Sequence, residues 1–227
     1  MTTDTSLSAV MRRRISTRAF LDTPVSEAEI RDLLDTARWA ASGGNLQPWN
    51  VHVVTGEARQ RVIDAVRARL EAAPFEDENE FGAYPNKLWE PYRTRRFELG
   101  EQMYDTIGIP REDKAGRLNQ LLSNFEFFGA PVGMFFSLDK GMNPNQWGHL
   151  GMFIMAFMLA AEEKGLATCA QEAWMTRHKT IATTLGLAED QRIWCGLALG
   201  HADPEAPVNS LRSERVEVNE FAVFDGF

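Results

Sequence analysis

The segment Val132–Leu138 constrains the fold of this chain more than any other. It is a continuous apolar run (VGMFFSL) bounded by Pro131 and Asp139. A strand without polar alternation is typical of one that is covered on both faces. The run therefore predicts a buried central strand in a sheet that helices flank.

Helices and strands mix around this strand without a strict strand–helix–strand rhythm. Ser26 and Glu29 form a capping box at the start of a helix. Hydrophobic periodicity predicts the other elements: a strand from about Trp49 to Val54, a helix after Gly56 with Val62, Ala65, Val66 and Leu70 inside, a helix from Trp147 to Lys164, a strand near Leu166–Cys169, a helix from Thr176 to Gly186 and a strand over Ile193–Leu199. This mixture favours an α+β fold with a mixed or antiparallel sheet, formed by residues 1–227 as a single domain.

Two segments differ from the rest of the chain. Residues 71–117 combine acidic residues and prolines with Phe81, Tyr84, Trp89 and Tyr92. Because large aromatic side chains need burial, we interpret this segment as an insertion with short helices that acts as a lid. Residues 203–227 end in an apolar tail, which we expect to dock on its own domain or on a neighbouring subunit.

Composition and charge exclude several classes of protein. The 227 residues include 24 Lys and Arg against 32 Asp and Glu, a net charge of −8, which argues against nucleic acid or an anionic membrane as partner. Cys169 and Cys195 are too few for a disulfide scaffold. Residues 1–10 lack a signal-peptide pattern, and Leu150–Ala161 is too short to span a membrane. We therefore expect a cytoplasmic protein.

The common catalytic signatures are missing from the sequence. It contains no G-x-G-x-x-G, no P-loop, no H-E-x-x-H and no G-x-S-x-G. The four histidines are scattered along the chain. We therefore expect no metal site built from protein ligands.

The strongest local anomaly is a cationic segment near the N-terminus. Residues 12–18 are RRRISTR, and residues 5–21 contain no acidic residue. In an extended segment Arg14, Ser16 and Arg18 point to one side. Two guanidiniums and a hydroxyl suit a phosphate and an adjacent polar ring. A solvent-exposed charge run is the alternative interpretation.

Two further segments have the character of binding loops. Residues 42–49 are SGGNLQPW, in which two glycines allow close backbone approach and Ser42 and Asn45 supply short polar side chains. An ordinary helix-to-strand turn is the alternative. Residues 209–215 (NSLRSER) form a second basic patch.

Together the three segments, in this order and spacing, resemble the nitroreductase family of flavin oxidoreductases. The family patterns R-x-S-x-R-x-F, S-x-x-N-x-Q-P-W and G-(H/Y)…P-x-N…R match Arg14, Ser16, Arg18, Phe20, Ser42, Asn45, Gln47, Pro48, Trp49, Gly200, His201, Pro207, Asn209 and Arg215. The resemblance extends from about Arg12 to Phe224. It implies an α+β homodimer with FMN at the dimer interface and a tail over residues 203–227 that embraces the partner.

The resemblance also implies a set of cofactor-binding residues: Arg14, Ile15, Ser16, Arg18, Ser42, Asn45, Gln47, Gln171, Glu172, Ala173, Asn209 and Arg215. In the family the N-terminal motif holds the flavin phosphate and the pyrimidine edge of the ring, and a late arginine holds the phosphate. Ser42 and Asn45 are expected to approach the flavin from the partner subunit.

Residues 170–174 (AQEAW) resemble the P-x-E-G segment of the family, with alanine in place of Pro and Gly. The main chain of Glu172 is then expected near flavin N5, with no side-chain acid or base involved; a surface glutamate is the alternative. Asn124 is an expected helix cap or a flavin contact. Trp147 and His149 are core and capping residues or line the substrate side.

The activity implied is that of an FMN-dependent enzyme that takes hydride from NADPH or NADH and passes it to a nitroaromatic, a quinone or a similar small oxidant by ping-pong kinetics. Two alternatives stay open within flavin chemistry: a flavin storage protein, or another reaction such as reductive dehalogenation. A third is a protein without flavin, whose basic cluster binds an anionic partner.

Overall fold

The apolar run of the sequence forms β3 (Val132–Asp139), an interior strand of an antiparallel sheet, in the computed structural model, which describes residues 4–74 and 83–227. The other strands are β1 (Phe20–Leu21), β2 (Asn50–Thr55), β4 (Ala167–Gln171) and β5 (Gln191–Ala202). The strand order is β1-β5-β3-β2, and β4 pairs with β5. The predicted central strand and the antiparallel α+β class are confirmed.

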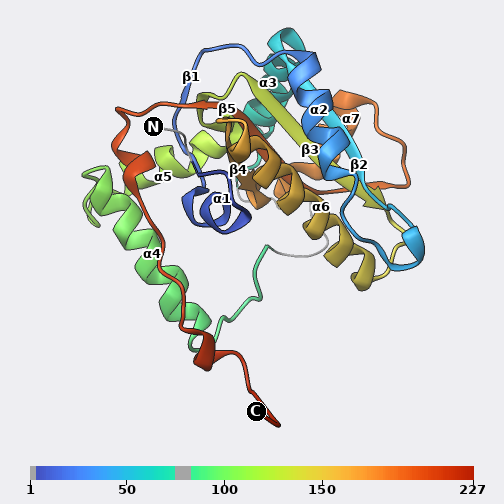
Figure 1. The fold of residues 1–227 in the computed structure, drawn as a ribbon. Helices are drawn as coiled ribbons and strands as arrows, with labels where there is room; N and C mark the ends of the chain where they lie inside the picture. The colour runs from blue at the N-terminus through green and yellow to red at the C-terminus, as the bar shows by residue number, and fades with distance from the viewer. Residues whose placement is uncertain (1–3, 75–82) are drawn as a thin grey trace.

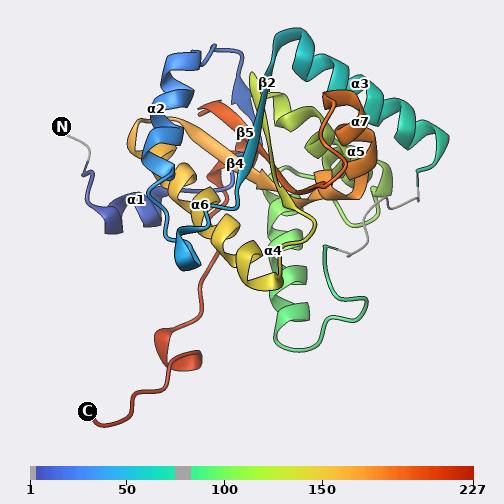
Figure 2. The same cartoon turned by 90° about the vertical axis from the view of Figure 1, so that its right-hand side faces the viewer.

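Helices cover both faces of the sheet (Figures 1 and 2). The described α-helices are α1 (Leu7–Arg13), α2 (Glu27–Ala37), α3 (Gly56–Ala72), α4 (Tyr92–Thr106), α5 (Lys114–Leu122), α6 (Pro144–Glu163) and α7 (His178–Leu185). Short 3₁₀ turns are η1 (Gly43–Asn45), η2 (Ser123–Gly129), η3 (Glu172–Arg177), η4 (Pro207–Ser210) and η5 (Val218–Glu220).

Alternation along β3 divides the core into two clusters. Met134 and Phe136 belong to the cluster that α2 and α6 cover, whereas Phe135 belongs to the cluster of α3, α7, η2 and η3. Successive side chains of a strand point to opposite faces, so a strand buried on both faces must be apolar throughout. The seven buried residues of β3 follow from this position.

The second cluster is built around Trp174, which is fully buried. Its ring lies 4.4 Å from that of Phe127 and 5.3 Å from that of Phe135, between ring centroids. The ring also fills the space in front of Gly196, where a Cβ would overlap it. Trp174 therefore has no room to shift.

Several element boundaries differ from those expected. The helix α6 begins at Pro144 rather than near Trp147, because Asn143 and Gln146 form a capping box. The strand expected over residues 166–169 runs instead from Ala167 to Gln171. The helix expected from Thr176 begins as η3 at Glu172 before it continues as α7.

We call α4 together with residues 211–227 the arm. Both parts project from the rest of the molecule (Figure 1), α4 contacts η4, and the side chains of Arg95 and Glu220 approach to 3.8 Å. The expectation that aromatic residues of the 71–117 segment are buried is wrong within this chain, because Tyr84, Trp89 and Tyr92 are 49% to 60% exposed. Phe81 lies outside the described residues.

Candidate functional site

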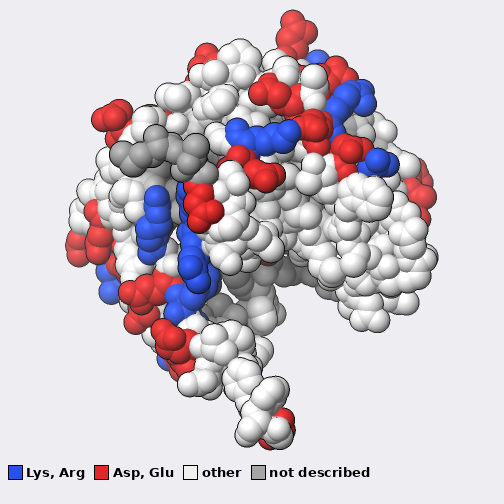
Figure 3. Space-filling view, in the orientation of Figure 1, with Lys and Arg blue, Asp and Glu red and all other residues white. Residues whose placement is uncertain are grey.

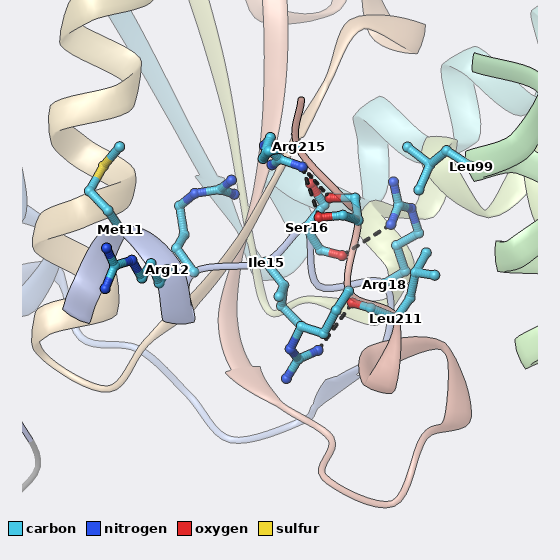
Figure 4. A pocket seen from close by; sticks show the side chains of 11 residues that line it. Met11, Arg12, Ile15, Ser16, Arg18, Leu99, Leu211 and Arg215 are labelled. Atoms are coloured by element: carbon cyan, nitrogen blue, oxygen red, sulfur yellow. Dashed lines mark hydrogen bonds between the residues drawn. The ribbon is translucent and has the colours of Figure 1, made fainter. Parts of the chain in front are cut away.

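A cavity of about 440 Å³ lies between the end of α1, the arm and the segment that follows α1 (Figure 4). Its lining residues are Met11, Arg12, Arg14, Ile15, Ser16, Arg18, Leu99, Leu211, Arg212, Ser213 and Arg215. The lining thus includes five guanidinium groups and no carboxylate. The volume falls within the range of about 300–1,000 Å³ that small-molecule sites occupy.

The cationic segment is extended because it joins the sheet. Ser16 forms a parallel bridge with Thr168 of β4, and the Thr17 N–H donates to the Thr168 carbonyl at 3.0 Å. Thr17 is buried, while the residues on either side of it line the cavity. The structure therefore brings Arg14, Ser16 and Arg18 together, as the expected alternation requires.

Asn209 holds this segment in place from the other end of the chain. Its Oδ1 accepts from the Arg18 N–H at 2.9 Å, and its Nδ2 donates to the carbonyls of Ala19 at 2.8 Å and Asp203 at 2.9 Å. The side chain is therefore used within the chain, and it fixes the distance between residues 14–18 and residues 211–215.

The guanidinium groups of the cavity lack carboxylate partners among the described residues. Arg14 Nε is buried and has no hydrogen-bond partner there. Arg212 and Arg215 donate to the main chain or to the Ser213 hydroxyl. Because an unpaired buried guanidinium is unfavourable, the donor set suits an anionic ligand such as a phosphate.

Arg13 does not share this property, although it lies within the same run of arginines. Its Nε is 2.7 Å from a carboxylate oxygen of Glu162 on α6. Although residues 5–21 contain no acidic residue, the positive charge of Arg13 is therefore compensated within the chain. An acid that is distant in sequence neutralises it, which local sequence cannot show.

The corner between β4 and η3 lies on the same strand as the Ser16 bridge. Gln171 is buried and its side chain points inward, whereas Glu172 is exposed. Partial burial of the Glu172 carboxyl nevertheless raises its pKa. Glu172 lies four positions after Thr168, about 13 Å of extended chain, so one ligand of that length can reach from the cavity to this corner.

The cysteines do not supply a nucleophile. Burial raises the pKa of the Cys169 thiol to about 11, although Arg18 and Arg14 act in the opposite direction. Burial likewise raises the pKa of the Cys195 thiol to about 12. Both are therefore neutral thiols at physiological pH. Among the described residues, no three His, Cys, Asp or Glu side chains are grouped as a metal ion requires.

Residues 42–47 lie away from the cavity. Gln47 donates its N–H to Ser42 Oγ at 3.0 Å, and Asn45 and Gln47 both have positive φ, at 55° and 48°. The Gly43 N–H donates to His149 Nε2 at 3.3 Å, near the start of α6. Glu162, which binds Arg13 beside the cavity, lies thirteen residues further along α6, about 20 Å at 1.5 Å per residue.

The remaining candidates have internal partners. Asn124 Nδ2 donates to the Leu121 carbonyl at 2.9 Å, as expected of a cap at the end of α5. The rings of Trp147 and Trp194 are 6.4 Å apart and perpendicular. The sequence interpretation did not single out Arg212 or Leu99: Arg212 belongs to the identified basic patch, but nothing in the sequence indicates that Leu99 of α4 reaches the cavity.

Comparison with known proteins gives concordant results. The model of the nitroreductase family matches residues 11–201. The chain is 38% identical over 224 residues to the nitrobenzene nitroreductase of Ectopseudomonas oleovorans, covering 99% of each chain. It is 40% identical over 219 residues to the 4-nitrobenzoate reductase of Pseudomonas putida, covering 96% of this chain and 95% of the relative. A solved structure, that of the FMN and NADPH-dependent nitroreductase NfnB from sphigopyxis sp. strain HMH, has a TM-score of 0.95 and 45% identity, covering 98% of this chain and 100% of that one.

Proposed function

The chain belongs to the nitroreductase family, and on that premise we propose that it is an FMN-dependent enzyme that reduces nitroaromatic compounds with NADPH or NADH. Relatives that match almost the whole chain are named for nitrobenzene and 4-nitrobenzoate, and NfnB is described as dependent on FMN and NADPH. A cytoplasmic location, where these nicotinamide donors are available, is part of the same proposal.

The observation that carries the proposal is the cluster of guanidiniums without carboxylate partners. Five arginines line one cavity without a carboxylate, and Arg14 Nε is buried there without a partner. A phosphate group satisfies such donors in bidentate fashion. In this proposal Arg14 and Arg215 bind the FMN phosphate, with Ser16 beside them.

FMN, when bound, supplies the redox chemistry by accepting a hydride equivalent and passing it on. The chain's own residues bind and orient it. A cation such as Arg18 near the pyrimidine edge favours the anionic reduced form of a flavin, and the main-chain N–H groups of Glu172 and Ala173 are placed beside the ring as donors. No side chain acts as an acid or a base in this scheme. Donor and oxidant use the same face in turn, which predicts ping-pong kinetics.

A second copy of the chain completes the site in this proposal. The two predicted flavin-contacting segments, 14–18 and 42–47, lie near opposite ends of α6, so one chain does not bring both to one ligand. The surface around residues 42–47 carries few charged side chains. This is visible in Figure 3 in the area where Figure 1, drawn in the same orientation, shows the loop before β2 and the start of α6. Exposed apolar side chains there include Trp39, Leu46 and Met152. A homodimer that buries this face supplies residues 42–47 to the partner's cavity.

The arm then covers the completed site. Leu99 of α4 already lines the cavity, and we propose that the 71–117 segment selects the oxidant while residues 203–227 hold the partner. Flavin storage and another flavin reaction remain the alternatives.

The visible absorption spectrum of the purified protein tests the proposal. We expect a yellow protein with bound FMN that bleaches under anaerobic NADPH or NADH and regains its colour with nitrobenzene or 4-nitrobenzoate. Bound FMN that neither donor reduces would favour storage, and recolouring only with a halogenated substrate would favour dehalogenation. A protein that stays colourless after incubation with FMN would overturn the proposal.

A further inference from the structure

The side chain of Gln171 has all its hydrogen-bonding groups satisfied inside the protein. It is 2% exposed. Its Nε2 donates to the Asn124 carbonyl at 2.8 Å and lies 3.3 Å from Asn124 Oδ1, while its Oε1 accepts from Trp174 Nε1 at 3.1 Å. The orientation of the amide is chemically forced, because an indole N–H only donates and the two Asn124 oxygens accept.

Both partners of Gln171 are themselves held firmly. Trp174 is fully buried against Phe127 and against the space in front of Gly196. Asn124 is fixed through its Nδ2, which donates to Leu121 at the end of α5. The Gln171 amide thus joins η2 to η3 through groups that cannot move independently.

The hydrogen bond between the Gln171 and Trp174 side chains connects the residues on either side of Glu172 and Ala173. Gln171 and Trp174 are three positions apart, and their side-chain hydrogen bond closes the first turn of η3 from the inside. No side chain caps the start of that turn. The direction of the Glu172 and Ala173 peptide groups therefore depends on the hydrogen bond between the Gln171 and Trp174 side chains. The strand β4 fixes the direction of the chain that leads to these two residues.

We propose that Gln171 is a positioning residue, which orients the Glu172 and Ala173 peptide groups against bound FMN without touching the cofactor through its own side chain. This inference rests on the proposed function. An N–H donor directed at the O4 carbonyl of a flavin ring stabilises the negative charge that the ring gains on reduction. Loss of the Gln171 side-chain hydrogen bonds then makes the bound FMN harder to reduce, while the arginines of the cavity still hold its phosphate.

The test uses the full-length variant Gln171→Met, which keeps the length of the side chain and removes its hydrogen bonds. We expect the equilibrium constant for reduction of bound FMN to fall about tenfold, which is about 30 mV for a two-electron couple. We expect the dissociation constant of FMN to change by less than about threefold, because the phosphate contacts remain. The potential is measured anaerobically against a reference dye.

The matched control is Ser137→Ala. Ser137 is also buried, and its Oγ donates to Gln191 Oε1 at 2.9 Å, on strands away from the β4–η3 corner. We expect this variant to melt at a lower temperature with an unchanged potential. A potential that shifts as much in Ser137→Ala as in Gln171→Met would reduce the role of Gln171 to general stability.

A milder variant serves if Gln171→Met does not fold. Asn124→Ala removes Oδ1 and Nδ2 but keeps the carbonyl that accepts from Gln171, so we expect a shift of the same sign and smaller size. An unchanged potential in the variant that folds, with wild-type FMN affinity, would overturn this inference and leave the proposed function intact. A wild-type protein that binds no FMN would instead overturn both.

Discussion

Aromatic side chains have opposite environments in two regions of this molecule. In the sheet and its helical layers, Trp174, Phe127 and Phe135 are at most 1% exposed. In the arm, Phe97 is 52% exposed and Phe221 is 70% exposed. Residues of equal hydrophobicity are therefore buried in one region and exposed in the other within one chain. The core therefore has its partners within the chain, whereas we propose that a second copy covers the exposed apolar residues of the arm.

Removal of residues 218–227 is the most direct test of the difference between the arm and the core. Truncation after Glu217 deletes the exposed apolar residues of 218–227 but no residue of the core. We expect a dimer to become a monomer while the cooperative unfolding of the sheet region persists, as light scattering and thermal melting would report. The variant Asp225→Asn, which keeps the apolar residues, is expected to stay dimeric. A truncated chain that remains a dimer would contradict the role given to the tail.

A methyl group added at Gly196 tests how tightly the core around Trp174 is packed. In Gly196→Ala the added Cβ overlaps the Trp174 ring, and overpacking of a closed core costs about 3 kcal/mol. Denaturant unfolding measures this loss. In the control Gly151→Ala, the added Cβ lies 3.5 Å from the Trp194 ring, an ordinary contact, so we expect unchanged or slightly raised stability. Equal stability of Gly196→Ala and wild type would show that Trp174 can shift after all.

The cavity lies where the two regions meet, so a substitution there sharpens the comparison. Arg14→Ala removes the guanidinium whose Nε is buried without a partner, and we expect FMN binding to weaken by about 1.5–3 kcal/mol, the usual contribution of a charged hydrogen bond. Quenching of FMN fluorescence measures the affinity. Arg31→Ala is the control, since this arginine is exposed and paired with Glu27. Unchanged affinity in Arg14→Ala, Arg18→Ala and Arg215→Ala together would remove the phosphate assignment.

The smallest expected effect concerns pH. Burial raises the pKa of the Glu172 carboxyl in the folded protein. Below the unfolded pKa, near 4.5, both states are protonated and no penalty exists; as the pH rises through the folded pKa, the penalty grows to its full value. The variant Glu172→Gln should therefore melt slightly above wild type at neutral pH and at the same temperature near pH 4. A difference that does not depend on pH would show that ionisation of Glu172 is not its cause.

Much of the fold could be predicted from sequence because its signals are local. The apolar run at 132–138 and the capping box of Ser26 and Glu29 each appear in the structure where expected. The start of α6 was misplaced because its capping box lies before the apolar pattern begins. Within residues 4–74 and 83–227, no helix has the length and apolar character of a membrane span.

The candidate site was only partly predictable. Alternation along an extended segment was sufficient to group Arg14, Ser16 and Arg18. The partner that neutralises Arg13 is 149 residues away in sequence, and the inward direction of Gln171 depends on Trp174 and Asn124. Such contacts depend on tertiary packing, for which a single sequence has no local signal.

The hydrogen bond between the Arg18 N–H and Asn209 Oδ1 spans 191 residues, and this has a consequence for synthesis of the chain. During translation the cationic segment emerges first, the strand that it pairs with follows much later at residues 167–171, and the asparagine that holds it emerges near the end. Such long-range closure is slow and comes late in folding. An unfinished nascent chain therefore cannot assemble the cavity, and uptake of FMN becomes possible only after nearly every residue has been made.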